Sequence, residues 1–208
     1  MNAQTQTFLI DGAAGALECK LDVPAEAAPR GIALVAHPHP LYGGTMDNKV
    51  AQTLARAFVA LGYASARMNF RGVGASAGSH DAGNGETDDM AVLHAHMLAR
   101  YPGLPVALAG FSFGTFVQAQ LQQRLSAQGQ AAERLALIGC AAGKWALPPV
   151  PANTILIHGE QDDTIPLTDV FEWARPQDLP VIVIPGADHF FHRKLHHIKA
   201  LLTELWHR

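Results

Sequence analysis

Short, mostly apolar runs alternate along the chain with segments in which apolar side chains recur every three or four residues. The runs predict strands buried on both faces of a sheet, at residues 31–36, 63–68, 105–109, 135–138, 154–157 and 181–184. The spacing of Val50, Leu54 and Phe58 predicts a helix after the first of these strands, and Gly62 ends it. Because strand and helix continue to alternate, we expect a mostly parallel sheet with helices on both faces.

The rest of the pattern is consistent with an α/β fold. Phe8–Ile10 and Leu17–Leu21, with Asp11 and Gly12 after the first segment, predict an antiparallel hairpin at one edge of the sheet. Thr87 is expected to cap a further helix, and three more helices are predicted at residues 115–125, 167–174 and 190–206. The chain shows no internal repeat and no linker, so residues 1–208 are expected to form a single domain.

Composition narrows the class of protein. With 49% hydrophobic and 16% charged residues, the chain has the balance of a globular domain rather than a disordered one. The net charge of −3 and the lack of a Lys/Arg cluster argue against nucleic acid and membrane surfaces as partners. No apolar run approaches the roughly 18 residues of a membrane span, and residues 1–7 do not resemble a signal peptide. Cys19 and Cys140 lie in apolar runs and are predicted to be buried free thiols, so we expect a cytoplasmic protein.

A glycine-flanked serine is the strongest chemical signal. Ser112 lies at the centre of Gly110-Phe111-Ser112-Phe113-Gly114, between a predicted strand and a predicted helix. On such a sharp turn the hydroxyl is exposed, and the residues two before and two after must be small because the arms of the turn nearly touch. The next N–H, that of Phe113, is at a helix N-terminus and suits an oxyanion. We therefore predict that Ser112 is the nucleophile of an acyl-transfer enzyme.

Ser112 needs a base, and the base needs a carboxylate that orients it. His189 follows the strand at 181–184, and Asp162 and Asp163 follow the strand at 154–157. All lie just past strand ends, and in a parallel sheet the carboxyl ends of the strands meet at one edge. The predicted triad is Ser112, His189 and one of the two aspartates. Their position in the loop does not show which of the two it is.

These motifs resemble the α/β-hydrolase fold superfamily over nearly the whole chain. The sequence carries G-x-S-x-G at 110–114, H-G-x-x-D-x-x-[VI]-P at 158–166 and G-x-x-H at 186–189, in that superfamily's order of nucleophile, acid and histidine. The resemblance implies that Asp162 is the acid. Residues 37–46 and 69–76 are similar to a group of small bacterial α/β hydrolases, mostly described as predicted serine hydrolases without an assigned substrate.

The resemblance also gives a role to the His37-Pro38-His39-Pro40 loop. The second oxyanion donor of the superfamily comes from the loop after the strand equivalent to 31–36. Pro38 and Pro40 have no N–H, which leaves the backbone of His39 as the expected donor. The rival interpretation is a metal site at His37 and His39, but no nearby Cys or carboxylate completes a ligand set. We expect neither a metal nor a cofactor.

Residues 139–153 are too few for the helical cap that many α/β hydrolases insert at this point. An open substrate pocket is therefore expected, and its apolar walls, without an obvious cation, favour small neutral acyl substrates such as short-chain esters. The expected lining residues are Leu41, Tyr42, Phe111, Phe113 and Trp145. We expect a carboxylesterase acting on a small-molecule acyl substrate.

Several alternatives stay open at this point. A peptidase, thioesterase or lactone hydrolase would use the same triad. A noncatalytic binding protein of this fold is the alternative from another class, although such proteins usually lack a triad residue. Arg71 is expected to brace the rim of the site, and Asp81, Glu86, Asp88 and Asp89 are expected to be solvated. The sequence leaves the oligomeric state open.

Overall fold

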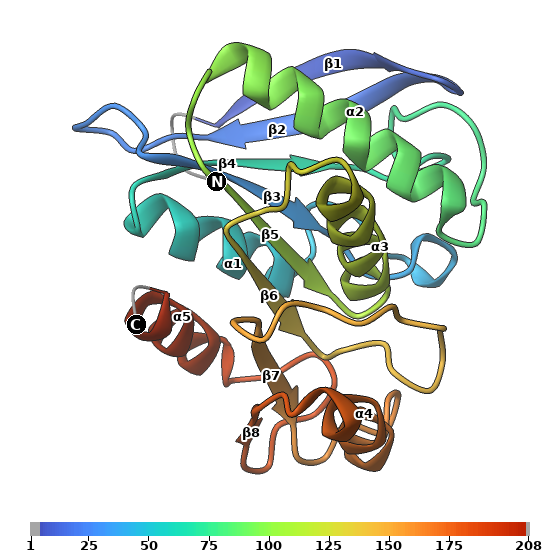
Figure 1. Ribbon diagram of the computed structural model, residues 1–208. Coiled ribbons are helices and arrows are strands. Elements are labelled where there is room, and N and C mark those ends of the chain that lie inside the picture. The colour runs from blue at the N-terminus through green and yellow to red at the C-terminus, as the bar shows by residue number, and fades with distance from the viewer. Residues whose placement is uncertain (1–4, 207–208) are drawn as a thin grey trace.

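The computed structural model of the protein describes residues 5–206 and contains one eight-stranded sheet (Figure 1). Its strand order is β1-β2-β4-β3-β5-β6-β7-β8, so β3 and β5 lie at the centre of the sheet. The strands from β3 onward are parallel, whereas β2 is antiparallel to both β1 and β4. The bounds of the strands are β1 Gln6–Gly12, β2 Gly15–Asp22, β3 Gly31–Ala36, β4 Tyr63–Met68, β5 Val106–Phe111, β6 Arg134–Ile138, β7 Ile155–Gly159 and β8 Val181–Ile184.

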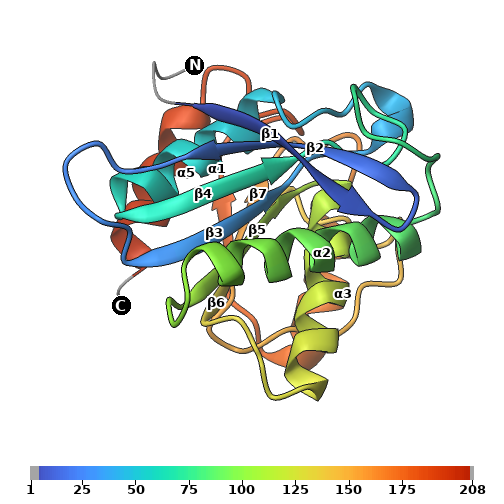
Figure 2. The same ribbon diagram turned by 90° about the horizontal axis from the view of Figure 1, so that it is seen from above.

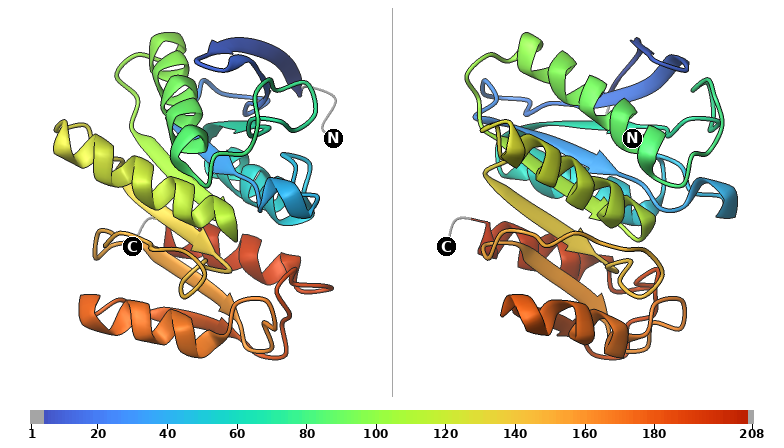
Figure 3. Two further views of the ribbon diagram at one scale, coloured as in Figure 1. Left: turned by 90° about the vertical axis from the view of Figure 1, so that its right-hand side faces the viewer. Right: turned by 45° about the vertical axis from the view of Figure 1, so that its right-hand side comes forward.

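Helices cover both faces of this sheet, as predicted. On one face, α1 (Lys49–Ala60) and α5 (Leu195–Leu205) lie side by side (Figure 2). On the other face lie α2 (Asn84–Arg100), α3 (Phe113–Ala127) and α4 (Leu167–Ala174), which face the viewer in the left panel of Figure 3. Two short 3₁₀ helices, η1 (Pro40–Tyr42) and η2 (Arg175–Gln177), complete the helical elements of residues 5–206.

The central strand β5 shows why the predicted runs are continuously apolar. Val106 and Leu108 pack into the core under α2 and α3, whereas Ala107 and Ala109 pack into the core under α1 and α5. Every residue of β5 is buried, so neither face tolerates polar side chains. The chain then passes directly from Phe111 to Ser112, which lies at the carboxyl edge of the sheet.

Two predicted helix starts are wrong. The last helix begins at Leu195 and not at residue 190, because Phe191 and Arg193 have positive φ angles of 54° and 61° that interrupt a helix. The second begins at Asn84 and not near Thr87. There the carboxylate of Glu86 accepts a hydrogen bond of 2.8 Å from the N–H of Gly83, which satisfies a free donor at the helix start.

The prediction of a solvated acidic segment before and within α2 is wrong at two positions. Glu86 and Asp89 are fully buried. Asp89 accepts two hydrogen bonds of 2.8 Å from the guanidinium of Arg71, which offsets the cost of burying both charges. Arg71 therefore braces the long loop between β4 and α2 against that helix.

The two cysteines are buried free thiols, as predicted from their apolar surroundings. Burial raises the pKa of both Cys19 and Cys140 to about 12, so neither thiol ionises near neutral pH. Between residues 5 and 206, none of the helices has the length and apolarity that a membrane crossing requires.

Candidate active site

Ser112 occupies a strained turn between β5 and α3. Its φ of 54° and ψ of −124° lie outside the regions that non-glycine residues usually adopt. The N–H of Ser112 donates to the carbonyl of Ile138, and the hydroxyl of Thr115 donates to the carbonyl of Ser112, so neighbouring groups hold the conformation. A Cβ on Gly110 would lie 2.4 Å from the carbonyl oxygen of Gly114, and a Cβ on Gly114 would lie 2.5 Å from the carbonyl oxygen of Ala36, so both positions need glycine.

Ser112, His189 and Asp162 form a continuous chain of hydrogen bonds. Ser112 Oγ lies 2.9 Å from His189 Nε2, and His189 Nδ1 lies 2.7 Å from Asp162 Oδ2. A carboxylate only accepts, so the neutral imidazole carries its proton on Nδ1 and offers Nε2 as the acceptor for the serine hydroxyl. All three side chains are buried. This arrangement can remove the proton of Ser112 during an attack.

The structure distinguishes between the two neighbouring aspartates. Asp162 Oδ1 accepts hydrogen bonds from the N–H groups of Thr164 (3.0 Å) and Ile165 (2.7 Å), which leaves Oδ2 directed at His189. Asp163 is exposed, and its carboxylate is 3.4 Å from the hydroxyl of Thr164. Asp162 is therefore the aspartate that contacts the histidine, in agreement with the family pattern.

Backbone hydrogen bonds connect the loop after β7, which carries Asp162, to the loop after β8, which carries His189. The N–H of Gln161 donates to the carbonyl of Ala187 at 2.8 Å, and the N–H of Glu160 donates to the carbonyl of Ile184 at 3.1 Å. A Cβ on Gly159 would lie 2.5 Å from the oxygen of Ala187, so the two loops are in direct backbone contact. The positions of Asp162 and His189 are thus coupled.

His158 is a positioning residue that our sequence interpretation used only as part of a motif. Its Nε2 donates to the carbonyl of Ile165 at 2.9 Å and lies 3.3 Å from Asp162 Oδ2. Burial lowers the pKa of His158, which keeps the ring neutral beside the carboxylate. The H-G-x-x-D spacing was the available signal for this positioning role, because it places His158 four residues before Asp162.

The loop after β3 is held by His37. Its buried ring accepts a hydrogen bond from the N–H of Phe70 at Nε2 (2.9 Å) and donates from Nδ1 to the carbonyl of Pro38 (2.6 Å). Burial lowers the pKa of His37 to about 3. Because backbone groups occupy both ring nitrogens, His37 is a structural part of the loop, and we discard the paired metal-ligand interpretation.

The two expected oxyanion donors both belong to residues that border Ser112. His39 and Phe113 line a cavity together with the serine. Within residues 5–206, the N–H groups of His39 and Phe113 have no hydrogen-bond acceptor. Two unpaired backbone N–H groups on residues that line the same cavity as the serine are the kind of donor that a developing oxyanion needs.

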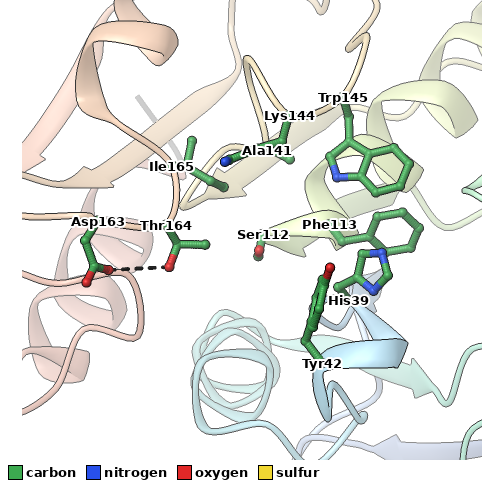
Figure 4. Close-up of a pocket in the computed structure, with 10 residues that line it drawn as sticks. All are labelled: His39, Tyr42, Ser112, Phe113, Ala141, Lys144, Trp145, Asp163, Thr164 and Ile165. Carbon is green, nitrogen blue, oxygen red and sulfur yellow. Dashed lines mark hydrogen bonds between the residues drawn. The ribbon is translucent and has the colours of Figure 1, made fainter.

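Two cavities meet at Ser112. The Trp145 cavity, of about 450 Å³, is shown in Figure 4 and is lined by His39, Tyr42, Ser112, Phe113, Ala141, Lys144, Trp145, Asp163, Thr164 and Ile165. The Phe190 cavity, of about 360 Å³, is lined by Pro38, His39, Tyr42, Gly43, Gly44, Asn48, Ser112, Thr164, His189 and Phe190. The serine therefore faces space on two sides.

The predicted lining is partly wrong. Tyr42, Phe113 and Trp145 border the Trp145 cavity as expected, but Phe111 and Leu41 border neither cavity. Phe111 continues the alternation of β5 and is buried on the α1–α5 face, with its ring 5.0 Å from that of His189. The side chain of Leu41 is turned to solvent on η1.

The expectation of a pocket without a cation is also wrong. Lys144 lines the Trp145 cavity, and its ammonium group points into it (Figure 4). The segment that carries Lys144 has no helical or strand periodicity, so the direction of this side chain was not readable from the sequence. The electrostatic character of the cavity therefore differs from the neutral one that we expected.

Comparisons with known proteins identify the family of this chain. The family described as serine aminopeptidase S33 matches residues 28–154. An uncharacterized protein of Rickettsia prowazekii is 32% identical and aligns with 83% of this chain and 77% of its own length.

Solved structures of similar length match as well. An α/β serine hydrolase without a lid from Xanthomonas campestris is 34% identical with a TM-score of 0.90, covering 99% of this chain and 94% of its own. An α/β serine hydrolase homologue from Coxiella burnetii is 34% identical with a TM-score of 0.87, covering 96% of each chain. The chain is a hydrolase that belongs to the serine aminopeptidase S33 family, in the small lidless group of the α/β-hydrolase superfamily.

Proposed function

We propose that this hydrolase cleaves esters of small acyl groups, with Ser112 as the nucleophile, His189 as the base and Asp162 as the partner of the imidazole. The observation that carries the proposal is the hydrogen-bond chain from Ser112 Oγ through His189 to Asp162. A noncatalytic binding protein would have no use for a strained serine aligned with a base. No cofactor takes part in the proposed reaction.

In the first step, Ser112 Oγ attacks the acyl carbonyl while His189 Nε2 takes the hydroxyl proton. The N–H groups of His39 and Phe113 donate to the oxyanion of the tetrahedral intermediate. The bond to the alcohol oxygen then breaks, His189 returns the proton to that oxygen, and the acyl group stays on Ser112. The Asp162 carboxylate stabilises the imidazolium while it exists.

In the second step, His189 removes a proton from water, and the resulting hydroxide attacks the acyl-enzyme carbonyl. The same two N–H groups hold the oxyanion. When the bond to Ser112 Oγ breaks, the proton returns to the serine and the free acid leaves. Over the two steps the acyl group passes from the alcohol to water, and both Ser112 and His189 return to their starting protonation states.

Active-site labelling tests this proposal. We expect a fluorophosphonate probe to label the wild type and the matched control Ser126→Ala, which changes an exposed serine at the end of α3. Ser112→Ala and His189→Ala are expected to lose both labelling and hydrolysis of p-nitrophenyl butyrate. Labelling of Ser112→Ala at wild-type strength would show that the nucleophile lies elsewhere.

The family description favours a second candidate, an aminopeptidase that uses the same triad. Such an enzyme must bind a protonated amino terminus next to the scissile bond. The Trp145 cavity pairs the carboxylate of Asp163 with the ammonium group of Lys144, so it offers no net negative charge to bind that terminus, which is why we favour esters. A panel of aminoacyl p-nitroanilides separates the two, because only the peptidase would hydrolyse them faster than matched esters.

A further inference from the structure

The two cavities beside Ser112 differ in the residues that line them. The inference drawn from this difference rests on the proposed function. His189 borders only the Phe190 cavity, whereas Phe113, which supplies an oxyanion donor, borders only the Trp145 cavity. His189 must protonate the leaving group, so the leaving group has to lie on the His189 side. The acyl group then extends to the opposite side, into the Trp145 cavity.

The wall of the Trp145 cavity carries two donors on adjacent residues. Figure 4 shows the ammonium group of Lys144 and the indole nitrogen of Trp145 directed into the space above Ser112. Neither group has a hydrogen-bond partner within residues 5–206. An ammonium and an indole N–H only donate, so the complementary group on a ligand is an acceptor, and a carboxylate pairs best with the charge.

This wall is held in place from several sides. The ring of Trp145 stacks on Phe116 with centroids 5.2 Å apart and contacts Phe113 at 4.9 Å. The N–H of Ala141 donates to the hydroxyl of Thr115 at 3.0 Å, and the indole of Trp173 donates to the carbonyl of Leu147 at 3.2 Å. The donors are therefore presented by an anchored segment, which favours recognition over chance exposure.

Two aspartates also lie at or beside the Trp145 cavity. Asp163 also lines the Trp145 cavity, but in Figure 4 its carboxylate lies on the far side from Lys144, near the hydroxyl of Thr164. Asp162 is buried and fully engaged by His189 and two backbone N–H groups. Lys144 is thus the cation that lines this cavity, and its ammonium group is directed into it in Figure 4.

We propose that the Trp145 cavity is the acyl subsite and that Lys144 and the indole N–H of Trp145 recognise a carboxylate at the far end of the acyl group. The substrate class is then half-esters of short dicarboxylic acids, whose apolar stem lies along the rings of Phe113 and Trp145. The alcohol departs through the Phe190 cavity. Lys144 acts as a specificity-determining residue.

The test compares two acyl groups with one leaving group. The substrates are p-nitrophenyl hydrogen adipate, which carries the carboxylate, and p-nitrophenyl methyl adipate, which is neutral. For the wild type, we expect kcat/KM to be higher for the anionic ester. In Lys144→Met the ratio of anionic to neutral kcat/KM falls by roughly two- to fivefold, as for one exposed charge-assisted contact, and Lys144→Arg restores most of it.

Two further variants sharpen the result. Lys199→Met removes an exposed lysine from α5 on the opposite face of the sheet and is expected to keep the wild-type ratio. Asp163→Asn removes the opposing carboxylate and is expected to raise the ratio. A wild-type ratio in Lys144→Met, or an equal fall in Lys199→Met, would overturn the proposal.

A second pair of substrates tests the assignment of the sides. When the carboxylate is placed on the alcohol of a neutral acyl ester, Lys144→Met is expected to leave the ratio of anionic to neutral ester unchanged. A fall in that series would place the alcohol, and not the acyl group, beside Lys144 and overturn the proposal. Loss of hydrolysis of every ester, with no fluorophosphonate labelling of the wild type, would instead refute the proposed function.

Discussion

Replacing Asp162 with asparagine tests the role of the acid, because the structure fixes how the new amide must lie. The N–H groups of Thr164 and Ile165 both donate to Asp162 Oδ1, so the oxygen of the introduced amide must remain at that position. The amide NH₂ then takes the place of Oδ2 and donates to His189 Nδ1. A ring that accepts at Nδ1 carries its proton on Nε2, which faces Ser112 and can no longer accept the serine proton.

The expected loss follows from that wrong tautomer. In serine hydrolase triads, the corresponding change lowers kcat by about 10⁴-fold, which corresponds to roughly 5.5 kcal/mol of transition-state stabilisation. Folding changes little, because both backbone bonds to Oδ1 are kept and only one contact loses its charge. Asp163→Asn is the matched control, and we expect it to retain kcat on a neutral p-nitrophenyl ester within a few-fold of the wild type.

The assay is steady-state hydrolysis of p-nitrophenyl butyrate by both variants, with circular dichroism to check folding. A folded Asp162→Asn variant that keeps kcat within about tenfold of the wild type would refute the role of Asp162, since the wrong tautomer costs far more. It is equally refuted when Asp163→Asn, and not Asp162→Asn, loses activity. Either result would mean that the hydrogen bond of 2.7 Å between His189 and Asp162 does not set the tautomer of the base.

Two other predictions concern folding. Gly110→Ala places a Cβ 2.4 Å from the carbonyl oxygen of Gly114, and we expect a fall in Tm of several degrees and loss of labelling, measured by thermal unfolding and fluorophosphonate reaction. The pKa of His37 is depressed to about 3 in the folded state from 6.5, so the unfolded chain binds a proton in this window and the folded one does not. Its contribution to the free energy of unfolding is therefore complete above pH 6.5 and falls by up to about 1.4 kcal/mol per pH unit towards pH 3. Urea unfolding of His37→Gln is expected to show a shallower pH dependence than that of the wild type, and an equal slope in both would contradict the assignment.

The sequence predicted the sheet and its helices because both depend on local periodicity. Strands buried on two faces are continuous apolar runs, and β3, β4 and β8 begin and end where the pattern indicated. The strained serine was equally readable, because backbone carbonyls exclude a side chain at the glycines on both sides of it, that of Gly114 at Gly110 and that of Ala36 at Gly114.

Features that depend on distant partners were not predicted. The burial of Asp89 follows from Arg71, which is 18 residues away along the chain, and no local signal reports that pair. The position of the loop did not separate the adjacent Asp162 and Asp163; the family pattern indicated Asp162, and the backbone donors of the following turn explain why it faces His189. The burial of Phe111, in contrast, follows from the local pattern, because it continues the alternation of Ala107 and Ala109 on the α1–α5 face of the sheet.

The residues of the proposed triad come from two separate parts of the sheet. Ser112 follows the central strand β5, whereas Asp162 and His189 follow β7 and β8 at the edge, and their loops are bonded to each other. Because the two loops are bonded to each other, Asp162 and His189 form one unit, and β6 is the strand that joins this unit to β5. The register of β6 with β5 and β7 therefore sets the distance between His189 Nε2 and Ser112 Oγ.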